Sequence, residues 1–470
     1  MDRVILPARR FTFPGKGPGS VGLPVLIYLL VLLLPALSWS SQDLRAESPG
    51  ELQSGQGESR LKEWLTPPRS DWGGHLKLYG SVSMPDEGSI LAPDGGRPFV
   101  DGSVELRLKN ELTFTDWAYL ETHYETVLSG GDTREAGSKA GRDIPFGSGV
   151  FFRGPIDDDR RLLDLTGVIT EEDRSIWYQR IDRLALTVTR EGNFVRIGRQ
   201  AITWGHGLLF NPMDLFNPFA PTDIERDYKI GDDMAVAQIN LPAGGDLQAL
   251  YVPRRNRESG DVEWNQSSLA GKWRFPLSTT EIEILAAKHF NDEVIGVGGT
   301  GYLGGAAWRT DAVWTFLHRS GFPEGYLSLV ANIDASWVWW DRNMYGFVEL
   351  FYSGLGKSDY QEALEDLDLV ERIERGDLFT LGRTYLAGHM RIELHPLFNA
   401  FLTVITNLED PSSVLQPRAA WNASEDIQIT FGFNIFCGAE ESEFGGFRIP
   451  DTGLSTAPPD SGFLWLSYYF

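Results

Sequence analysis

Residues Val104–Phe114 read VELRLKNELTF, and apolar and polar side chains alternate along the stretch. Its even positions are mainly valine, leucine and phenylalanine, whereas its odd positions include Glu105, Arg107, Lys109 and Glu111. Because successive side chains of a strand point to opposite faces, this pattern predicts a strand with one apolar and one charged face. The stretch is also about as long as a tilted strand that crosses a bilayer.

The same alternation recurs to the C-terminus, with short and long connections in turn, which is typical of a closed antiparallel transmembrane β-barrel. An even number of strands places both ends of such a barrel on one side of the membrane. The long connections include 129–177, 203–230 and 355–376. We predict eighteen strands, give or take two, at 74–84, 102–114, 118–128, 178–190, 193–202, 231–241, 245–252, 266–275, 279–289, 293–300, 304–317, 326–338, 343–354, 377–391, 397–409, 413–423, 425–437 and 462–470.

The N-terminus has the order of features found in an export signal. Four basic residues between Arg3 and Lys16 precede an apolar run over 21–37, which ends at small residues around Ser40. This order predicts a signal peptide over 1–40. An uncleaved membrane anchor is the alternative, because the run is near the lower length limit for a membrane span. Residues 41–73 are then a polar periplasmic leader, and 74–470 are the barrel.

Charge and cysteine content exclude several classes of function. The formal net charge of −23 is opposite to that of a nucleic-acid-binding protein. The single cysteine, Cys437, excludes an internal disulfide and any cysteine-based zinc site.

The C-terminal residues Gly462–Phe470, GFLWLSYYF, end in an aromatic residue. This stretch resembles the terminal strand of bacterial outer-membrane β-barrels. The resemblance implies that Tyr468 and Phe470 form the signal that the barrel-assembly machinery recognises. Together with the export signal, it indicates a multi-pass barrel in the outer membrane of a Gram-negative bacterium.

One long connection differs from the others. Residues Thr203–Gly231 read TWGHGLLFNPMDLFNPFAPTDIERDYKIG, and their prolines exclude both a long helix and a strand within the sheet. The stretch nevertheless carries more apolar side chains than a solvated loop tolerates. We therefore expect it to fold into the barrel or across its mouth, with 203–230 forming a constriction.

The preceding segment, Arg196–Gly205 or RIGRQAITWG, is the most specific internal motif. It resembles the Gly-Arg-Gln strand and Trp-Gly turn of porin-like outer-membrane proteins, including alginate-export-type barrels, which also have eighteen strands. An alginate exporter needs a strongly positive constriction, and here many acids accompany the basic residues. Anchoring of the loop is the alternative role for Arg199 and Trp204.

The alternation also assigns charged residues of both signs to the lumen. Such a wall can orient polar solutes, or its charges can simply pair between neighbouring strands. The charges expected on the inward face are Lys77, Glu105, Arg107, Lys109, Glu111, Glu121, Glu125, Arg183, Lys272, Arg274, Glu281, Glu283, Arg309, Asp311, Asp334, Glu349, Arg391 and Glu393. The candidates for the pore lining and the constriction are Arg107, Lys109, Glu111, Arg183, Arg196, Arg199, Trp204, His206, Asp214, Asp223, Arg226, Arg309 and Asp311.

The sequence offers little sign of catalysis. No two of the seven histidines have the spacing of a metal-binding pair, so we expect no metal site, no cofactor and no enzymatic activity. The acidic run Asp157–Asp159 could bind a divalent cation, although a solvated loop tip is the commoner role of such a run.

These features predict a channel for the passive passage of small hydrophilic solutes. Its other expected partners are membrane lipid and the assembly machinery, and a homo-oligomer is an open alternative. Two further functions compete with the channel. One is a dedicated conduit, for an exported polysaccharide or as the sheath of an electron-transfer complex. The other is a plugged barrel that acts in adhesion or partner binding.

Overall fold

The computed structural model describes residues 68–92, 96–140, 157–222, 228–318, 325–449 and 452–470. Nineteen strands form a single sheet, and eighteen of them make the barrel wall. The barrel strands are β1 (Arg69–Met84), β2 (Phe99–Thr115), β3 (Ala118–Gly131), β5 (Ser175–Arg190), β6 (Asn193–Gln200), β7 (Asp232–Asn240), β8 (Asp246–Val252), β9 (Ser268–Leu277), β10 (Thr280–His289), β11 (Asp292–Leu303), β12 (Ala306–Phe316), β13 (Gly325–Trp339), β14 (Arg342–Ser353), β15 (Thr384–His395), β16 (Phe398–Asn407), β17 (Ser412–Asn422), β18 (Ile427–Cys437) and β19 (Asp460–Tyr469).

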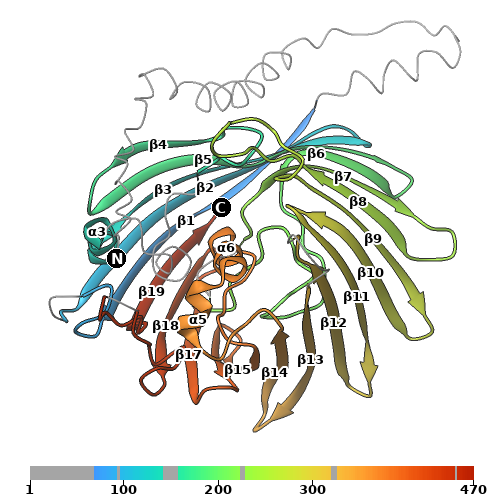
Figure 1. Cartoon of the computed structure of the whole chain (residues 1–470). Helices are drawn as coiled ribbons and strands as arrows, with labels where there is room; N and C mark the ends of the chain where they lie inside the picture. The colour runs from blue at the N-terminus through green and yellow to red at the C-terminus, as the bar shows by residue number, and fades with distance from the viewer. Residues whose placement is uncertain (1–67, 93–95, 141–156, 223–227, 319–324, 450–451) are drawn as a thin grey trace, which may run out of the picture. The chain divides into compact units, whose positions relative to one another are not determined.

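The last strand closes the ring against the first (Figure 1). β1 and β19 are antiparallel, with His75 opposite Tyr469 and Met84 opposite Asp460. Beyond the strand, the backbone of Phe470 exchanges two hydrogen bonds with Gly74. Because every barrel strand is antiparallel to its neighbours, the prediction of a closed eighteen-stranded antiparallel barrel is confirmed.

The nineteenth strand, β4 (Thr166–Glu171), pairs only with β5. It covers one half of the β5 edge, around Ile176–Arg180, whereas β6 pairs with the other half, around Leu184–Arg190. The wall strands that follow are consequently short. β6, β7 and β8 have 8, 9 and 7 residues, against 16 in β1 and 17 in β2.

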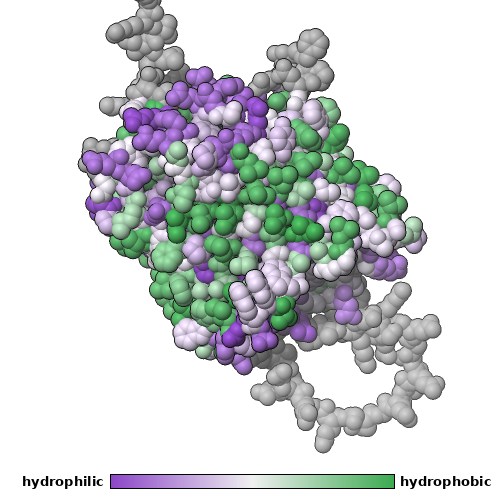
Figure 2. All heavy atoms as spheres, turned by 90° about the horizontal axis from the view of Figure 1, so that it is seen from below, coloured by the Kyte–Doolittle hydropathy of each residue, from purple (hydrophilic) through white to green (hydrophobic). Residues whose placement is uncertain are grey.

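The outer face of the barrel is apolar. In β1, Leu76, Leu78 and Val82 are exposed, whereas His75 and Lys77 on the opposite face are buried. Apolar residues cover the middle of the surface that Figure 2 shows, and hydrophilic residues lie towards its two ends. We call the end of the barrel at which short turns join the strands the short-turn end. Exposed tryptophans lie there, among them Trp117, Trp340 and Trp421. An apolar band with an aromatic girdle is the architecture of outer-membrane β-barrels.

Turn chemistry fixes the register of the tight hairpins. Glu191 and Gly192 join β5 to β6 with φ angles of 53° and 80°, and Trp340 and Asp341 join β13 to β14 with 50° and 55°. Positive φ at both central residues is the turn geometry that matches the twist of paired strands.

The long connections contain structure that the sequence analysis did not predict. Helix α3 (Asp132–Ala140) precedes β4, and helices α5 (Tyr360–Glu365) and α6 (Leu367–Arg375) lie between β14 and β15. Asp366 caps the start of α6. In the part of the chain that the structure describes, no helix is long and apolar enough to span a membrane.

Most strand boundaries differ from the prediction by no more than three residues, and two strands differ by more. β1 begins at Arg69, so the end of the predicted leader belongs to the wall. β15 was predicted over 377–391 but covers Thr384–His395, because 377–383 run back from α6 as a loop. The predicted signal peptide, 1–40, and leader residues 41–67 lie outside the described residues.

Candidate functional site

The stretch between β6 and β7 folds into the lumen, as predicted, and appears in Figure 1 as a green trace inside the ring of strands. We call residues 203–230 the insert. Trp204, Met213 and Phe216 are buried in one cluster with inward side chains of β7–β12. On another part of the wall, the Phe210 ring stacks on the Phe351 ring of β14, with the ring centroids 4.5 Å apart. Large apolar side chains of the insert therefore pack against the inner wall.

Two wall carboxylates hold the first turn of the insert. The backbone nitrogen of His206 donates to Asp311 Oδ2 over 2.6 Å, and His206 Nδ1 lies 2.7 Å from Asp311 Oδ1. The three backbone N–H groups of Leu208–Phe210 donate to the carboxylate of Glu349 over 2.6–3.0 Å. Asn332 Nδ2 joins the two anchors by donating to His206 O and to Glu349. Hydrogen bonds to a charged acceptor are roughly twice as strong as neutral ones, so this attachment is firm.

The other end of the insert reaches different strands. Thr222 O accepts a hydrogen bond from Gln416 Nε2 of β17. The hydroxyl of Tyr228 contacts His75 of β1, and the guanidinium of Arg107 of β2 lies 4.0 Å from the centre of the Tyr228 ring. The contacts on β12, β14 and β17 lie near the middle of those strands. The insert therefore bridges separate parts of the wall at mid-height.

All eighteen charges predicted to face the lumen lie on the face opposite the exposed apolar side chains. Several form a buried network. Arg107 donates to Glu125 over 2.8 Å and to Asp182 over 2.6 Å. Arg183 also pairs with Asp182, and Arg180 pairs with Glu125. Arg107 is thus held by carboxylates of β3 and β5, and Arg183 by the adjacent carboxylate of its own strand. The wall charges pair with one another, and for Arg107 and Glu125 this is the pairing between neighbouring strands that the sequence analysis gave as the alternative.

Three candidates lie towards the short-turn end of the lumen. Arg196 donates to Thr187 and to the hydroxyl of Tyr119. Lys109 is half-buried and Glu111 is exposed. Among the predicted lining residues, these are the ones most accessible to a solute on that side of the insert.

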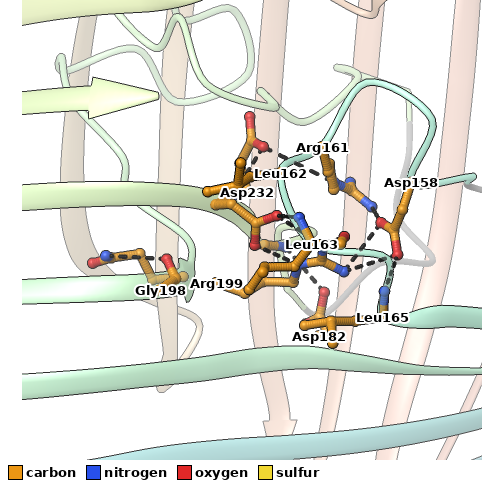
Figure 3. Close-up of polar contacts among 12 residues, drawn as sticks. Asp158, Arg161, Leu162, Leu163, Leu165, Asp182, Gly198, Arg199 and Asp232 are labelled. Carbon is orange, nitrogen blue, oxygen red and sulfur yellow. Dashed lines mark hydrogen bonds and ion pairs between the residues drawn. The ribbon is translucent and has the colours of Figure 1, made fainter. Parts of the chain in front are cut away.

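Arg199 does not face the lumen. It shares the parity of the exposed Val195 and Ile197 and is 1% exposed. Its guanidinium pairs with Asp158 over 3.0 Å (Figure 3). It also pairs with Asp233 over 2.9 Å. The assignment of Arg199 to the pore lining is therefore wrong. This side chain anchors a loop, which is the kind of role that the sequence analysis gave as the alternative, but the loop is the connection before β4 and not the insert.

Asp158 also differs from both roles considered for the acidic run Asp157–Asp159. It pairs with Arg161 and Arg199 and accepts a hydrogen bond from the backbone nitrogen of Leu165. Since its two carboxylate oxygens are taken up by these contacts, it is neither a solvated loop tip nor a cation ligand. Burial would raise the pKa of Asp158, but the two arginines outweigh burial and hold the pKa below its ordinary value.

The remaining candidates are anchors or pairs. Trp204 is 2% exposed, and its Nε1 donates a hydrogen bond to Gln248 of β8, so this side chain attaches the insert to the wall. Arg309 forms an ion pair with Asp334 on the lumen wall. The carboxylate of Asp214 pairs with Lys229 inside the insert.

Burial raises the pKa of Asp214 to about 6, although Lys229 acts in the opposite direction. The pKa of His206 is also raised. Burial lowers it, but the hydrogen bond and the charge of Asp311 outweigh burial. Asp223 and Arg226 lie outside the described residues.

The structure brings together a serine, a histidine and an aspartate that were not linked in the sequence analysis. Ser268 Oγ lies 3.1 Å from His289 Nδ1, and His289 Nε2 lies 3.5 Å from Asp377 Oδ1. Serine hydrolases use these three groups in this order. Here Ser268 is fully buried, and its Oγ accepts a hydrogen bond from Arg254 Nη1. A substrate carbonyl has no access to this hydroxyl, so the contacts fasten the loop after α6 to the wall.

A pocket lies on the long-loop side of the insert. Its volume is about 80 Å³, and Phe210 and Pro218 of the insert form one side. Arg372 and Arg375 of α6 form another. The insert thus closes the inner end of a vestibule that carries both apolar and charged groups.

No protein-family model matches this chain, and no curated protein matches it. Solved structures of outer-membrane barrels resemble it. Acinetobacter baumannii OccAB2 has a TM-score of 0.49 at 9% identity, over 85% of this chain and 98% of its own. Escherichia coli Wzi, titled a carbohydrate-binding β-barrel involved in capsule assembly, has 0.47 at 10%, over 88% and 86%. Pseudomonas aeruginosa OccK5 has 0.46 at 9%, over 85% and 98%.

At these identities the likeness concerns the barrel alone, and the resemblance to alginate-export-type barrels stays a prediction.

Proposed function

We propose that this chain is a channel of the bacterial outer membrane through which small hydrophilic solutes pass passively, with the insert as its constriction. The proposal includes export by the signal at 1–40 and a periplasmic leader that ends just before β1. A barrel of eighteen strands is wide enough to hold an aqueous lumen around a partial plug. No chemistry on the solute is needed, because passage is selected by size and charge.

The single observation that carries the proposal is the position of the insert. It is attached at mid-height to β12 and β14 at one end and to β17, β1 and β2 at the other. A segment on the outer rim would fit a barrel that acts through its loops. A segment at mid-height narrows whatever passes.

The lumen wall supports a passage without strong selection for one sign of charge. Basic side chains such as Arg107 and Arg183 are neutralised by carboxylates. A conduit for a polyanionic polysaccharide would need unpaired positive charge at its narrowest point. This pairing therefore favours the channel over the polysaccharide conduit.

The test is single-channel conductance in planar bilayers for the intact chain and for a chain that lacks 208–226. The channel proposal expects the intact chain to conduct and the deletion to conduct more. A matched control replaces the exposed turn 257–260 between β8 and β9 by glycine and serine, and should conduct like the intact chain. If neither the intact chain nor the deletion conducts, the proposal fails. If only the deletion conducts, the insert is a plug, and the adhesion or partner-binding function takes its place.

A further inference from the structure

Three neighbouring strands leave a gap in the lumen wall beside the insert. Glu283 of β10 lies opposite Gly298 of β11, which lies opposite Asp311 of β12. A Cβ atom at Gly298 would stand 2.9 Å from His206 Nδ1 and 2.2 Å from Asp311 Oδ1. Because glycine has no side chain, the imidazole of His206 can occupy this space between two wall carboxylates.

Three potential ligands converge there. His206, Glu281 and Glu283 each present one nitrogen or oxygen atom, and these atoms all lie within 4.8 Å of one another. His206 uses Nδ1 for Asp311, which leaves Nε2 as its free ring nitrogen. A carboxylate that holds the other nitrogen of a histidine is the usual second-layer partner of a metal-binding imidazole.

One carboxylate oxygen of Glu283 is buried without a hydrogen-bond partner among the described residues. Glu283 is 4% exposed, and Lys272 Nζ donates a hydrogen bond to its Oε1 over 2.9 Å. The other oxygen, Oε2, is buried and has no hydrogen-bond partner among the described residues. Buried carboxylate oxygens are normally satisfied, so this atom calls for a cation or a donor.

The charge balance points the same way. Among the described residues, four carboxylates surround the cluster, and only two lysine or arginine side chains form ion pairs with them. The cations are Lys272 and Arg274, and the carboxylates are Asp246, Glu281, Glu283 and Asp311. Two negative charges are therefore left when His206 is neutral, which is the charge that one divalent cation supplies.

We propose that His206, Glu281 and Glu283 bind one divalent transition-metal ion, with Asp311 as a positioning residue for the imidazole. One nitrogen and two carboxylate oxygens suit zinc and similar ions, whereas calcium and magnesium prefer oxygen alone. Water fills the remaining coordination positions. The ion joins the insert to β10 and so adds a fastening that the hydrogen bonds to β12 and β14 do not provide.

No metal site was predicted from the sequence, because no two histidines have the spacing of a metal-binding pair. Here a single histidine arrives from the insert, and the two glutamates come from alternate positions of one strand. The inference does not depend on conduction, because binding to the folded chain is measured in detergent.

The test is equilibrium dialysis of the refolded full-length protein against Zn²⁺ at pH 8, where protons compete less for His206. The structure leads us to expect one Zn²⁺ per chain. The variants Glu281→Gln and Glu283→Gln keep the shape of the side chain and should weaken binding at least tenfold, and the double variant should abolish it. The exposed His395→Gln is the control and should bind like the wild type. Heat-modifiable electrophoretic mobility checks that each variant is folded.

The absorption spectrum of Co²⁺ added to the wild type gives a second readout that needs no variant. Bands in the visible range with the intensity of nitrogen and oxygen ligation support the site. The proposal is overturned if the wild type binds no Zn²⁺ and gives no such bands. It is equally overturned if the double variant binds as tightly as the wild type, because the result is then an adventitious ion only.

Discussion

Arg199 of β6 and Asp158 of the connection before β4 form a buried ion pair, in which Nη1 of the arginine lies 3.0 Å from Oδ1 of the aspartate. The pair holds the segment 157–165 over the ends of the short strands β6 and β7. Leu163 takes part through its backbone, since its oxygen accepts from Arg199 and its nitrogen donates to Asp233. One arginine therefore connects the wall to the longest outer loop.

The first prediction concerns acid release of this segment. The pKa of Asp158 is held below its ordinary value of about 3.9. A carboxyl group with a lowered pKa stabilises the fold above the unfolded-state value, and that stability is lost as the pH falls through the folded-state value. We therefore expect hydrogen exchange over 157–165, corrected for intrinsic rates, to be slow at pH 7 and to accelerate below about pH 4.

Asp158→Asn should remove most of that pH dependence and release the segment at pH 7. Breaking a buried ion pair by loss of one partner costs about 3–5 kcal/mol. Asp159→Asn changes an exposed neighbour and serves as the control. Equal protection of 157–165 in the wild type and Asp158→Asn at pH 7 would contradict the anchoring role.

The second prediction concerns the attachment of the insert to β14. Glu349→Gln replaces an anion that accepts three backbone hydrogen bonds by a neutral amide. We expect a loss of roughly 1–3 kcal/mol in the free energy that docks the insert. Because the barrel itself is unchanged, single-channel recordings should show added current noise without a change in strand content.

Glu393→Gln, at the short-turn end of β15, is the matched control. It should leave the current noise at the wild-type level. If Glu349→Gln is as quiet as Glu393→Gln, the insert is held by its apolar contacts alone.

The third prediction separates lumen charges that are paired from those that are exposed. Glu111 is exposed, so Glu111→Lys should shift the reversal potential in a salt gradient towards anion selectivity. Arg107 is 1% exposed and held by two carboxylates. Arg107→Lys should therefore lower the thermal stability with little effect on the reversal potential. The reverse pattern would mean that the buried network faces the permeating ions.

The fourth prediction concerns assembly. The C-terminal strand closes the barrel, and Tyr468 and Phe470 are both exposed. If these aromatics form the assembly signal, removal of Phe470 should slow assembly in cells and leave unfolded chains in the periplasm. The same deletion should refold in detergent almost as well as the wild type. Slow refolding in detergent as well would assign Phe470 to barrel closure rather than to recognition.

The barrel strands could be predicted from the sequence because the signal is local. Alternation such as that of Val104–Phe114 follows from lipid on one face and water on the other, and it needs no knowledge of distant residues. The insert was predicted for a similar reason, since apolar side chains such as Phe210 and Phe216 must be buried somewhere. Even the error at β15 is local, because Leu378, Phe379 and Leu381 read as strand but line or border the vestibule.

The site could not be predicted to the same depth, because its contacts join residues far apart in the chain. Parity alone would have placed Arg199 on the outer face, but only the fold brings Asp158 to cover it. His206 meets Glu281 and Glu283 because the insert turns inward at the right height. Ser268, His289 and Asp377 likewise meet through the return of the chain from α6.

The unequal lengths of the wall strands have a consequence for the surrounding lipid. At about 3.4 Å per residue and a tilt of about 40°, the 7–9 residues of β6–β8 reach roughly 18–23 Å along the bilayer normal, whereas the strands on the β1–β2 side exceed about 40 Å. An apolar band about 25 Å tall is therefore barely matched beside β6–β8 and amply matched beside β1 and β2, which lie a few strands away in the ring. The bilayer must thin next to the short strands, or the whole barrel must tilt towards them. Either way, the lipid around the barrel is deformed more on one side than on the other.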